Sequence, residues 1–342
     1  MQQGAYTALI TPFKDNKVDY ETIEKLIAFQ IENGISGILA LGTTSESPTL
    51  SVKEQDGIID FAAKNTKDKC YFIAGTGSNS TEKTIKSSKR AAKAGADAVL
   101  LVDPYYNGPS SIEIRKEYVA PVASAFPNLE IIPYIIPSRT GTQLFAEDLA
   151  ILNDEFNNVN SVKEATGSFE NMKRIRGCCG ENFAIFSGDD ANTYKMMTDS
   201  DIKAAGVISV ISNIAPKAIS DMVELINKGL LDKAKAIAFN LAPLFNIVSV
   251  STSFKTPYNS EVIYKAKNPL PIKTIMAILG IITGEFRRPL GKMTKEGLDT
   301  VVRALKKVHS NDPEILKSAA QFFNVDIIER INNSDYVKDL YY

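Results

Sequence analysis

The sequence predicts an α/β protein: a (β/α)8 TIM barrel followed by a C-terminal helical appendage. Short apolar runs alternate with amphipathic stretches from residue 4 onward, which is typical of a parallel sheet covered by helices. Eight such repeats end near Gly229, and eight strands fit a closed barrel better than an open sheet. After Gly229 the apolar residues recur only at helical spacing, so the appendage is predicted to contain helices alone.

Each predicted strand is an apolar run that ends in polar or turn-forming residues. The strands are expected to begin near Gly4, Gly37, Cys70, Asp97, Glu130, Val159, Phe183 and Ala204. The helices between them carry start signals. Ser51 and Glu54 have the spacing of a capping box, and Asp19 and Ser80 are expected N-caps. We therefore assign residues 1–229 to the barrel.

The remaining chain is divided into two parts. Residues 230–308 are assigned to a helical domain, whose helices are expected over roughly 230–248, 270–284 and 294–308. Residues 309–342 form a C-terminal extension. It opens with Asn311-Asp312-Pro313, a cap followed by proline in the first helical turn, so we expect one or two short helices there.

Composition excludes several classes of function. The 39 basic and 40 acidic residues leave a formal net charge of −1, which provides no field to attract nucleic acid or an anionic membrane. No stretch has the length of a transmembrane helix and the N-terminus lacks the features of a secretory signal, so we expect a cytoplasmic protein. The three cysteines suit a reducing compartment and are expected to be small buried residues.

A single histidine, His309, narrows the chemistry further. Histidine-based zinc sites and Ser-His-Asp machinery both require histidine at the reacting centre, so we expect no metal. Acids, bases and nucleophiles must then come from lysine, tyrosine, aspartate, glutamate, threonine or cysteine.

Lys163 is the candidate nucleophile. It lies in the apolar strand SVKEA and faces the barrel interior if Val162 faces outward. Burial disfavours the ammonium, so the amine would be free to attack a ketone. The alternative is a lysine that is satisfied by an ion pair, for instance with Glu164 or with an aspartate after the seventh strand.

Other polar residues follow the ends of neighbouring strands, where barrel enzymes place their active sites. Tyr134 has inward parity on the fifth strand, and Thr44 and Tyr106 are candidates for a hydroxyl relay that moves its proton. Arg139 can hold a substrate carboxylate with two parallel hydrogen bonds. Taken singly, each of these residues could instead be an ordinary polar residue at a barrel rim or, for Arg139, part of a surface ion pair.

In combination these segments resemble the dihydrodipicolinate synthase and N-acetylneuraminate lyase family of class I pyruvate aldolases. The resemblance covers roughly residues 4–308. It rests on GTTSESPTL, IAGTGSNST, DPYYNGP, YIIPSRTG, VKEATG, SGDD, GVISV and NPLPIK, in that order along the chain. It implies a Schiff base of pyruvate on the enzyme, with no separate cofactor.

The resemblance also implies roles for individual residues. Lys163 would form the Schiff base, Tyr134 would donate and accept protons, and Thr44 would connect Tyr134 to Tyr106, which in the family enters from a neighbouring subunit of a homodimer or homotetramer. The pyruvate carboxylate and pocket lining would be provided by Thr43, Thr44, Gly188 and Ile208. A regulatory lysine site would include Ser47, Asn79 and Tyr105.

Arg139 distinguishes the branches of the family. Dihydrodipicolinate synthases are similar to this chain in the segment Pro-Ser-Arg-Thr-Gly, whereas sugar-acid lyases usually lack the arginine. The resemblance therefore implies condensation of pyruvate with L-aspartate 4-semialdehyde to 4-hydroxy-tetrahydrodipicolinate, in lysine and diaminopimelate biosynthesis. One alternative is a lyase of N-acetylneuraminate or of a 2-keto-3-deoxy sugar acid. Another is a catalytically inactive barrel that acts as a binding protein.

The chain departs from the family pattern at several positions. Ser45 stands where glycine is usual, Ile135 replaces the asparagine after the tyrosine, and Pro133 removes a hydrogen-bond donor inside a strand. Val52 and Lys83 occupy positions where lysine-sensitive members usually have histidine and glutamate. A cation at Lys83 would repel the ammonium of a lysine ligand.

Overall fold

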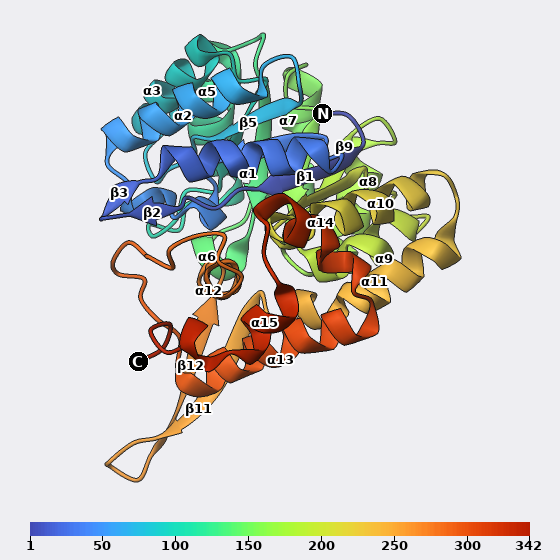
Figure 1. Ribbon diagram of the computed structural model, residues 1–342. Coiled ribbons are helices and arrows are strands. Elements are labelled where there is room, and N and C mark those ends of the chain that lie inside the picture. The colour runs from blue at the N-terminus through green and yellow to red at the C-terminus, as the bar shows by residue number, and fades with distance from the viewer.

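The computed structural model describes residues 1–342 and contains the predicted barrel. Eight parallel strands close in the order β1-β10-β9-β8-β7-β6-β5-β4, and helices surround them (Figure 1). Each strand begins at most two residues from its predicted start. The strands are β1 (Gly4–Ala8), β4 (Gly37–Ala40), β5 (Tyr71–Gly75), β6 (Ala98–Val102), β7 (Glu130–Ile135), β8 (Ser161–Glu164), β9 (Ala184–Ser187) and β10 (Gly206–Ser209).

Helices follow the strands and cover the outside of the barrel. The longer ones are α1 (Tyr20–Glu32), α2 (Val52–Thr66), α3 (Thr81–Ala94), α7 (Ala146–Glu155), α8 (Phe169–Cys179) and α10 (Pro216–Asn227). Shorter helical pieces are η1 (Thr43–Ser45), η2 (Ser47–Thr49), α4 (Ser111–Glu113), η3 (Ile114–Val119), α5 (Ala120–Ala125), α6 (Pro137–Thr140), η4 (Asp190–Asn192), α9 (Thr193–Thr198) and η5 (Ile211–Asn213). A small hairpin, β2 (Phe13–Lys14) with β3 (Lys17–Val18), precedes α1.

The predicted helix starts are confirmed. Ser51 and Glu54 form both hydrogen bonds of a capping box at α2. Asp19 caps α1 and Ser80 caps α3, each through a side-chain oxygen that accepts a backbone N–H. Pro133 does not interrupt β7, which pairs with β6 along its length.

The strands separate two apolar layers. Side chains that point into the barrel form one small cluster, and side chains on the opposite face join the large core beneath the helices. Tyr134 and Ile132 belong to the inner cluster, whereas Val162 belongs to the outer core. The pleat alternation that was expected for β7 and β8 is therefore confirmed.

The appendage differs from the prediction of helices alone. Three helices are present, α11 (Leu231–Phe245), α12 (Leu270–Ile278) and α13 (Lys295–Asn311), but α12 ends before the predicted residue 284. Between α11 and α12 the chain forms an antiparallel hairpin, β11 (Ser249–Lys255) with β12 (Glu261–Lys267). Its alternating serines and apolar residues have strand periodicity, which the search for helical spacing missed.

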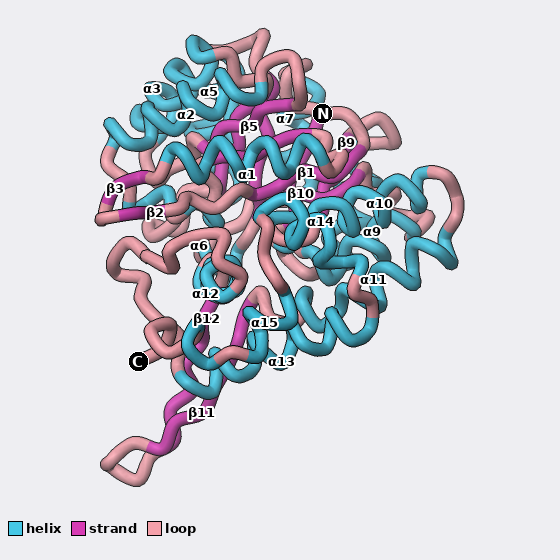
Figure 2. Tube along the Cα trace, viewed as in Figure 1, coloured by secondary structure: helices cyan, strands magenta, loops and turns pink.

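The hairpin extends away from the rest of the molecule, as Figure 2 shows. Its turn, Pro257-Tyr258-Asn259, places Asn259 at a φ of 58°, the left-handed conformation that three-residue hairpin loops require. The tip therefore has a regular hairpin geometry, even though few other residues contact it.

The C-terminal extension is helical, as expected, and it packs on the body. It consists of α14 (Glu314–Phe323), α15 (Ile327–Asn332) and η6 (Ser334–Tyr336). The Phe29 ring of α1 lies 5.2 Å from the Phe322 ring and 5.0 Å from the Phe323 ring. No helix in the structure is long and apolar enough to span a bilayer.

Candidate active site

Lys163 and Tyr134 lie side by side at the mouth of the barrel. They are paired residues on the neighbouring strands β8 and β7. The Lys163 amine lies 4.4 Å from the centroid of the Tyr134 ring. This end of the barrel faces α12, which is drawn next to α6 in Figure 1, and Arg139 of α6 donates a hydrogen bond to the Asn268 carbonyl just before α12. The two residues singled out from sequence are thus in contact.

The Lys163 amine is buried and has no acidic partner. The residue is 5% exposed and takes part in no ion pair, although sixteen are present elsewhere in the chain. Glu164, one of the two expected partners, instead accepts hydrogen bonds from Thr166 and Asn171. Burial lowers the pKa of Lys163 to about 7; the charge of Asp190 opposes this shift and that of Arg139 adds to it. A substantial fraction of the amine is therefore neutral near pH 7.

Gly188 packs closely against Lys163, and Asp190 holds the loop that follows β9 through hydrogen bonds. A Cβ on Gly188 would lie 3.2 Å from the Lys163 Cε and 2.8 Å from the Ala165 Cβ. Asp190 accepts backbone N–H bonds from Val210 (2.8 Å) and Ile211, next to Ile208 at the end of β10. Burial raises the pKa of Asp190 to about 6, and its hydrogen bonds limit that rise. Gly188 therefore lies against the Lys163 side chain, and Ile208 belongs to the inner apolar cluster of the barrel.

Thr43, rather than the expected Thr44, is the threonine whose side chain influences the pKa of Tyr134. Burial raises the pKa of Tyr134, while the charge of Arg139 and a hydrogen bond with the Thr43 side chain oppose that rise. The Thr44 hydroxyl instead accepts a hydrogen bond of 3.0 Å from the Asn268 side chain.

Tyr106 is not part of the site within one chain. It is 91% exposed, has a φ of 83° and forms no hydrogen bond inside the chain. The expected link between Thr44 and Tyr106 is therefore absent from the single subunit. Its exposed ring is accessible to another molecule. The resemblance implies such a tyrosine, because in the family it enters the site of a neighbouring subunit.

Asn268 connects two binding residues and was missed as a site residue. Its carbonyl accepts a hydrogen bond of 2.9 Å from the Arg139 guanidinium, and its side-chain amide donates to Thr44. The residue is 8% exposed and precedes α12. The segment NPLPIK was the available signal, but its asparagine follows no barrel strand, so the pattern of strand ends does not identify it as a functional residue.

A buried ion pair holds the loop that carries both threonines. Glu46 follows η1 with a left-handed φ of 57° and pairs with Lys273 of α12, with both side chains fully buried. The Arg287 backbone N–H also donates to Glu46. Ser45, at the usual glycine position, donates a hydrogen bond of 2.6 Å to the Leu9 carbonyl. The loop thus accommodates Ser45, because the left-handed residue is Glu46.

A cleft of about 670 Å³ opens from this site toward α2 and α3. Thr43, Tyr134 and Arg139 line its inner part. The expected regulatory residues Ser47, Asn79 and Tyr105 line the same cleft, together with Val52 and Lys83. Lys86 and Arg90 also line it, so its outer wall is mainly basic.

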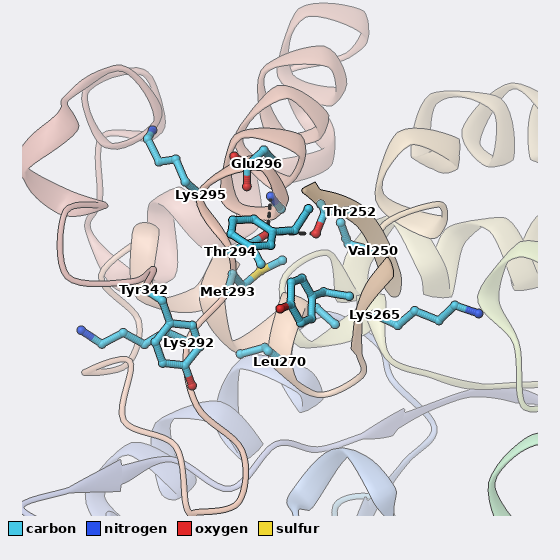
Figure 3. A pocket seen from close by; sticks show the side chains of 14 residues that line it. Val250, Thr252, Lys265, Leu270, Lys292, Met293, Thr294, Lys295, Glu296 and Tyr342 are labelled. Atoms are coloured by element: carbon cyan, nitrogen blue, oxygen red, sulfur yellow. Dashed lines mark hydrogen bonds between the residues drawn. The ribbon is translucent and has the colours of Figure 1, made fainter. Parts of the chain in front are cut away.

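A second cavity, of about 540 Å³, lies at the base of the C-terminal hairpin (Figure 3). Val250 and Thr252 of β11 face Met293 and Thr294 across it. The Thr252 and Thr294 hydroxyls are 3.1 Å apart. This cavity contains none of the residues predicted for catalysis.

The chain matches known proteins over most of its length. Residues 1–308 match the model of the Dihydrodipicolinate synthetase family. The 4-hydroxy-tetrahydrodipicolinate synthase of Hydrogenobaculum sp. is 38% identical over 307 residues, which cover 90% of this chain and 99% of that protein. That of Methanococcus vannielii is 40% identical over 293 residues, covering 86% and 94%. The solved structure of the enzyme from Methylacidiphilum fumariolicum superposes with a TM-score of 0.83 at 34% identity, covering 92% of this chain and 99% of that one.

Proposed function

The chain belongs to the dihydrodipicolinate synthetase family, and from this membership we propose that Lys163 binds pyruvate as a Schiff base. The protein is a lyase-type enzyme that condenses pyruvate with L-aspartate 4-semialdehyde. The product is 4-hydroxy-tetrahydrodipicolinate, in the biosynthesis of diaminopimelate and lysine. The geometry of the barrel mouth supports the role proposed for Lys163 and for the residues around it.

The observation that supports Lys163 is an amine that is buried without an acidic partner. A buried lysine normally finds a carboxylate, because an uncompensated ammonium is costly in a medium of low dielectric. Here the cost lowers the pKa to about 7, which leaves the lone pair available for attack on the pyruvate ketone. The amine then replaces the carbonyl oxygen, which leaves as water.

Tyr134 is proposed to move the protons of this reaction. Water leaves the carbinolamine only after its hydroxyl is protonated, and the enamine forms only after a methyl proton of the bound pyruvate is removed. The Tyr134 ring lies 4.4 Å from the amine, and the Thr43 side chain helps to limit the rise in the pKa of Tyr134. The enamine carbon then attacks the aldehyde of the second substrate, and the amino group of that substrate displaces Lys163 as the ring closes.

The two substrate carboxylates are proposed to bind on opposite sides of Asn268. The Thr44 hydroxyl already accepts a hydrogen bond from Asn268, so its own proton is free for the pyruvate carboxylate. Thr43, Gly188 and the Ile208 backbone would line the same pocket. Arg139, held by the Asn268 carbonyl, would bind the carboxylate of aspartate semialdehyde.

We further propose that the enzyme is a cytoplasmic homodimer or homotetramer that needs no separate cofactor. The exposed Tyr106 would enter the site of a neighbouring subunit. The lysine-binding pocket formed by Ser47, Asn79 and Tyr105 is proposed to be weak or absent, because Lys83 lines the same cleft and repels an ammonium.

Reduction with borohydride in the presence of pyruvate tests the proposed nucleophile. We expect one irreversible adduct, located on Lys163 by peptide mass mapping and absent from Lys163→Ala. Lys273 is the matched control, because it is equally buried but ion-paired. An adduct on Lys273, or none on the parent protein, would refute the proposal.

Kinetic assays then test the second substrate. Condensation with aspartate semialdehyde should be fast, and Arg139→Ala should chiefly raise the KM for that substrate. Cleavage of N-acetylneuraminate or of a 2-keto-3-deoxy sugar acid at a higher kcat/KM would instead support the alternative branch.

A further inference from the structure

We propose that the hairpin β11–β12 is a dimerisation arm, in which strand β12 pairs antiparallel with β12 of a second copy of this chain. The proposed contact is separate from the active site and does not depend on the proposed chemistry. Its evidence is the exposure of the arm, the free edge of β12 and the sequence of that edge.

The arm is amphipathic but only partly covered. In the observed register Val250, Thr252 and Phe254 lie opposite Ala266, Tyr264 and Val262, so these six residues share one face. Near the base this face covers the cavity shown in Figure 3. Farther out it is exposed: Phe254 by 48% and Tyr264 by 46%. A two-stranded hairpin with an open apolar face is marginally stable alone, and a sheet of four strands is not.

The main-chain groups on the outer edge of β12 can be identified. The Thr256 N–H donates to the Ser260 carbonyl, and the Asn268 N–H donates to the Val248 carbonyl. Hydrogen-bonded pairs alternate along an antiparallel ladder, so even-numbered residues bond within the hairpin. The odd-numbered residues of β12 therefore direct their N–H and C=O groups outward. These are Glu261, Ile263, Lys265 and Lys267.

The outer edge of β12 is complementary to itself. If two copies pair about Tyr264, Ile263 of one lies opposite Lys265 of the other, and both are outward-facing residues that can form ladder hydrogen bonds. Glu261 then lies opposite Lys267, and the two-fold axis makes this ion pair twice. Lys267, which would repel an unrelated basic strand, is thus matched by Glu261 of the second copy, whereas Lys265 lies opposite Ile263.

The equivalent edge of β11 does not offer this match. Its outward residues are Ser249, Ser251, Ser253 and Lys255, so pairing about Thr252 would leave each lysine opposite a serine. Strand β11 also lies beside α13 through the hydroxyls of Thr252 and Thr294. The charge pattern and the open edge therefore both favour β12 as the contact.

Cysteine cross-linking tests the proposed register in the full-length protein. Cys178 is exposed, so the prediction that the cysteines are buried is wrong for this residue. In a Cys178→Ser background, Tyr264→Cys should form a disulfide-linked dimer under mild oxidation. The two Tyr264 residues would form a non-hydrogen-bonded pair with Cα atoms about 4.5 Å apart, within disulfide range. Val262→Cys is the matched control, because its copies would lie roughly 14 Å apart.

Charge exchange provides the second test, with cross-linking of the Tyr264→Cys variant as the readout. Glu261→Lys should reduce the rate of dimer formation about tenfold, because it creates two like-charge pairs. Lys267→Glu combined with Glu261→Lys restores both pairs and should restore the rate. The proposal is overturned if Tyr264→Cys gives no dimer, if Val262→Cys cross-links equally well, or if the double exchange fails to rescue a folded protein.

Discussion

The molecule buries a lysine in each of two regions, and the two lysines have opposite surroundings. Lys163 lies in the barrel mouth without an acidic partner. Lys273 lies in the appendage, paired with Glu46 and within 4.8 Å of the Phe13 and Phe286 ring centroids. Burial lowers the pKa of both, but for Lys273 Glu46 opposes the shift through its charge and a hydrogen bond. Both lysines are buried, so the feature that distinguishes them is the acidic partner, which Lys273 has and Lys163 lacks.

Replacing Lys163 by methionine has the largest expected effect. It should abolish activity and at the same time increase stability. Turnover should be abolished, because the proposed Schiff base cannot form without this amine. The free energy of unfolding should increase by roughly 1 to 2 kcal/mol, because the buried amine is unpaired. The folded pKa of Lys163 lies below its unfolded value, so the gain should grow as pH falls from about 10 to 7 and then stay constant.

Denaturant unfolding of the parent and Lys163→Met at several pH values measures this gain. Lys273→Met is the matched control and should lose stability at every pH. A destabilised Lys163→Met would show that the amine has a partner after all.

Replacing Thr43 should lower the catalytic rate far more than replacing Thr44, the other threonine of η1. Thr43→Val removes the hydroxyl beside Tyr134, and we expect kcat to fall about 100-fold or more, as for loss of a proton-transfer group. Thr44→Val removes the acceptor of Asn268 and should chiefly raise the KM for pyruvate. Steady-state kinetics decide the assignment, and the opposite pattern would restore the role first expected for Thr44.

The Glu46–Lys273 pair should contribute to stability only as a pair. Glu46→Gln leaves a buried ammonium uncompensated and should cost about 3 to 5 kcal/mol. The double replacement by Glu46→Leu and Lys273→Met removes both charges and should recover most of that loss. Chemical denaturation tests this, and a double variant no more stable than Glu46→Gln would contradict the explanation.

The pH dependence of Schiff-base formation should report the environment of Lys163. Only the neutral amine attacks, so the rate should rise about tenfold per unit up to about pH 7 and then level off. The charge of Asp190 raises the pKa of Lys163, so Asp190→Asn should move the midpoint lower. Rapid-quench borohydride trapping measures the rate, and a midpoint above about pH 9 would mean that the amine is solvated.

The barrel was predictable from sequence because its signals are local. Each strand is a short apolar run, and a closed parallel sheet brings all strand ends to one mouth, so Lys163 and Tyr134 could be placed together. Two features were not predictable in this way. Whether Thr43 or Thr44 faces the phenol depends on the rotation of one helical turn, and Asn268 reaches the site from a segment outside the barrel pattern.

The hairpin was also not predicted. The residues after Gly229 were interpreted by helical spacing, whereas residues 249–255 alternate with the period of a strand. The same residues show how far the barrel mouth depends on the appendage. Asn268 immediately follows β12, and its contacts with Thr44 and Arg139 connect the appendage to both proposed substrate sites.

Shortening the hairpin should have the smallest effect on catalysis. Replacing residues 253–263 by Asn-Gly deletes the exposed outer half, and the two-residue turn keeps the pairs next to Asn268. We expect both KM values to stay within about twofold, because the contacts of Asn268 lie beyond the deleted segment. Asn268→Asp is the contrasting variant: it reverses the polarity of the bond to Thr44, whose hydroxyl would then donate to the carboxylate, and it should raise the KM for pyruvate. If the shortened hairpin raises the KM as much as Asn268→Asp does, the arm itself supports the barrel mouth and the two regions do not function separately.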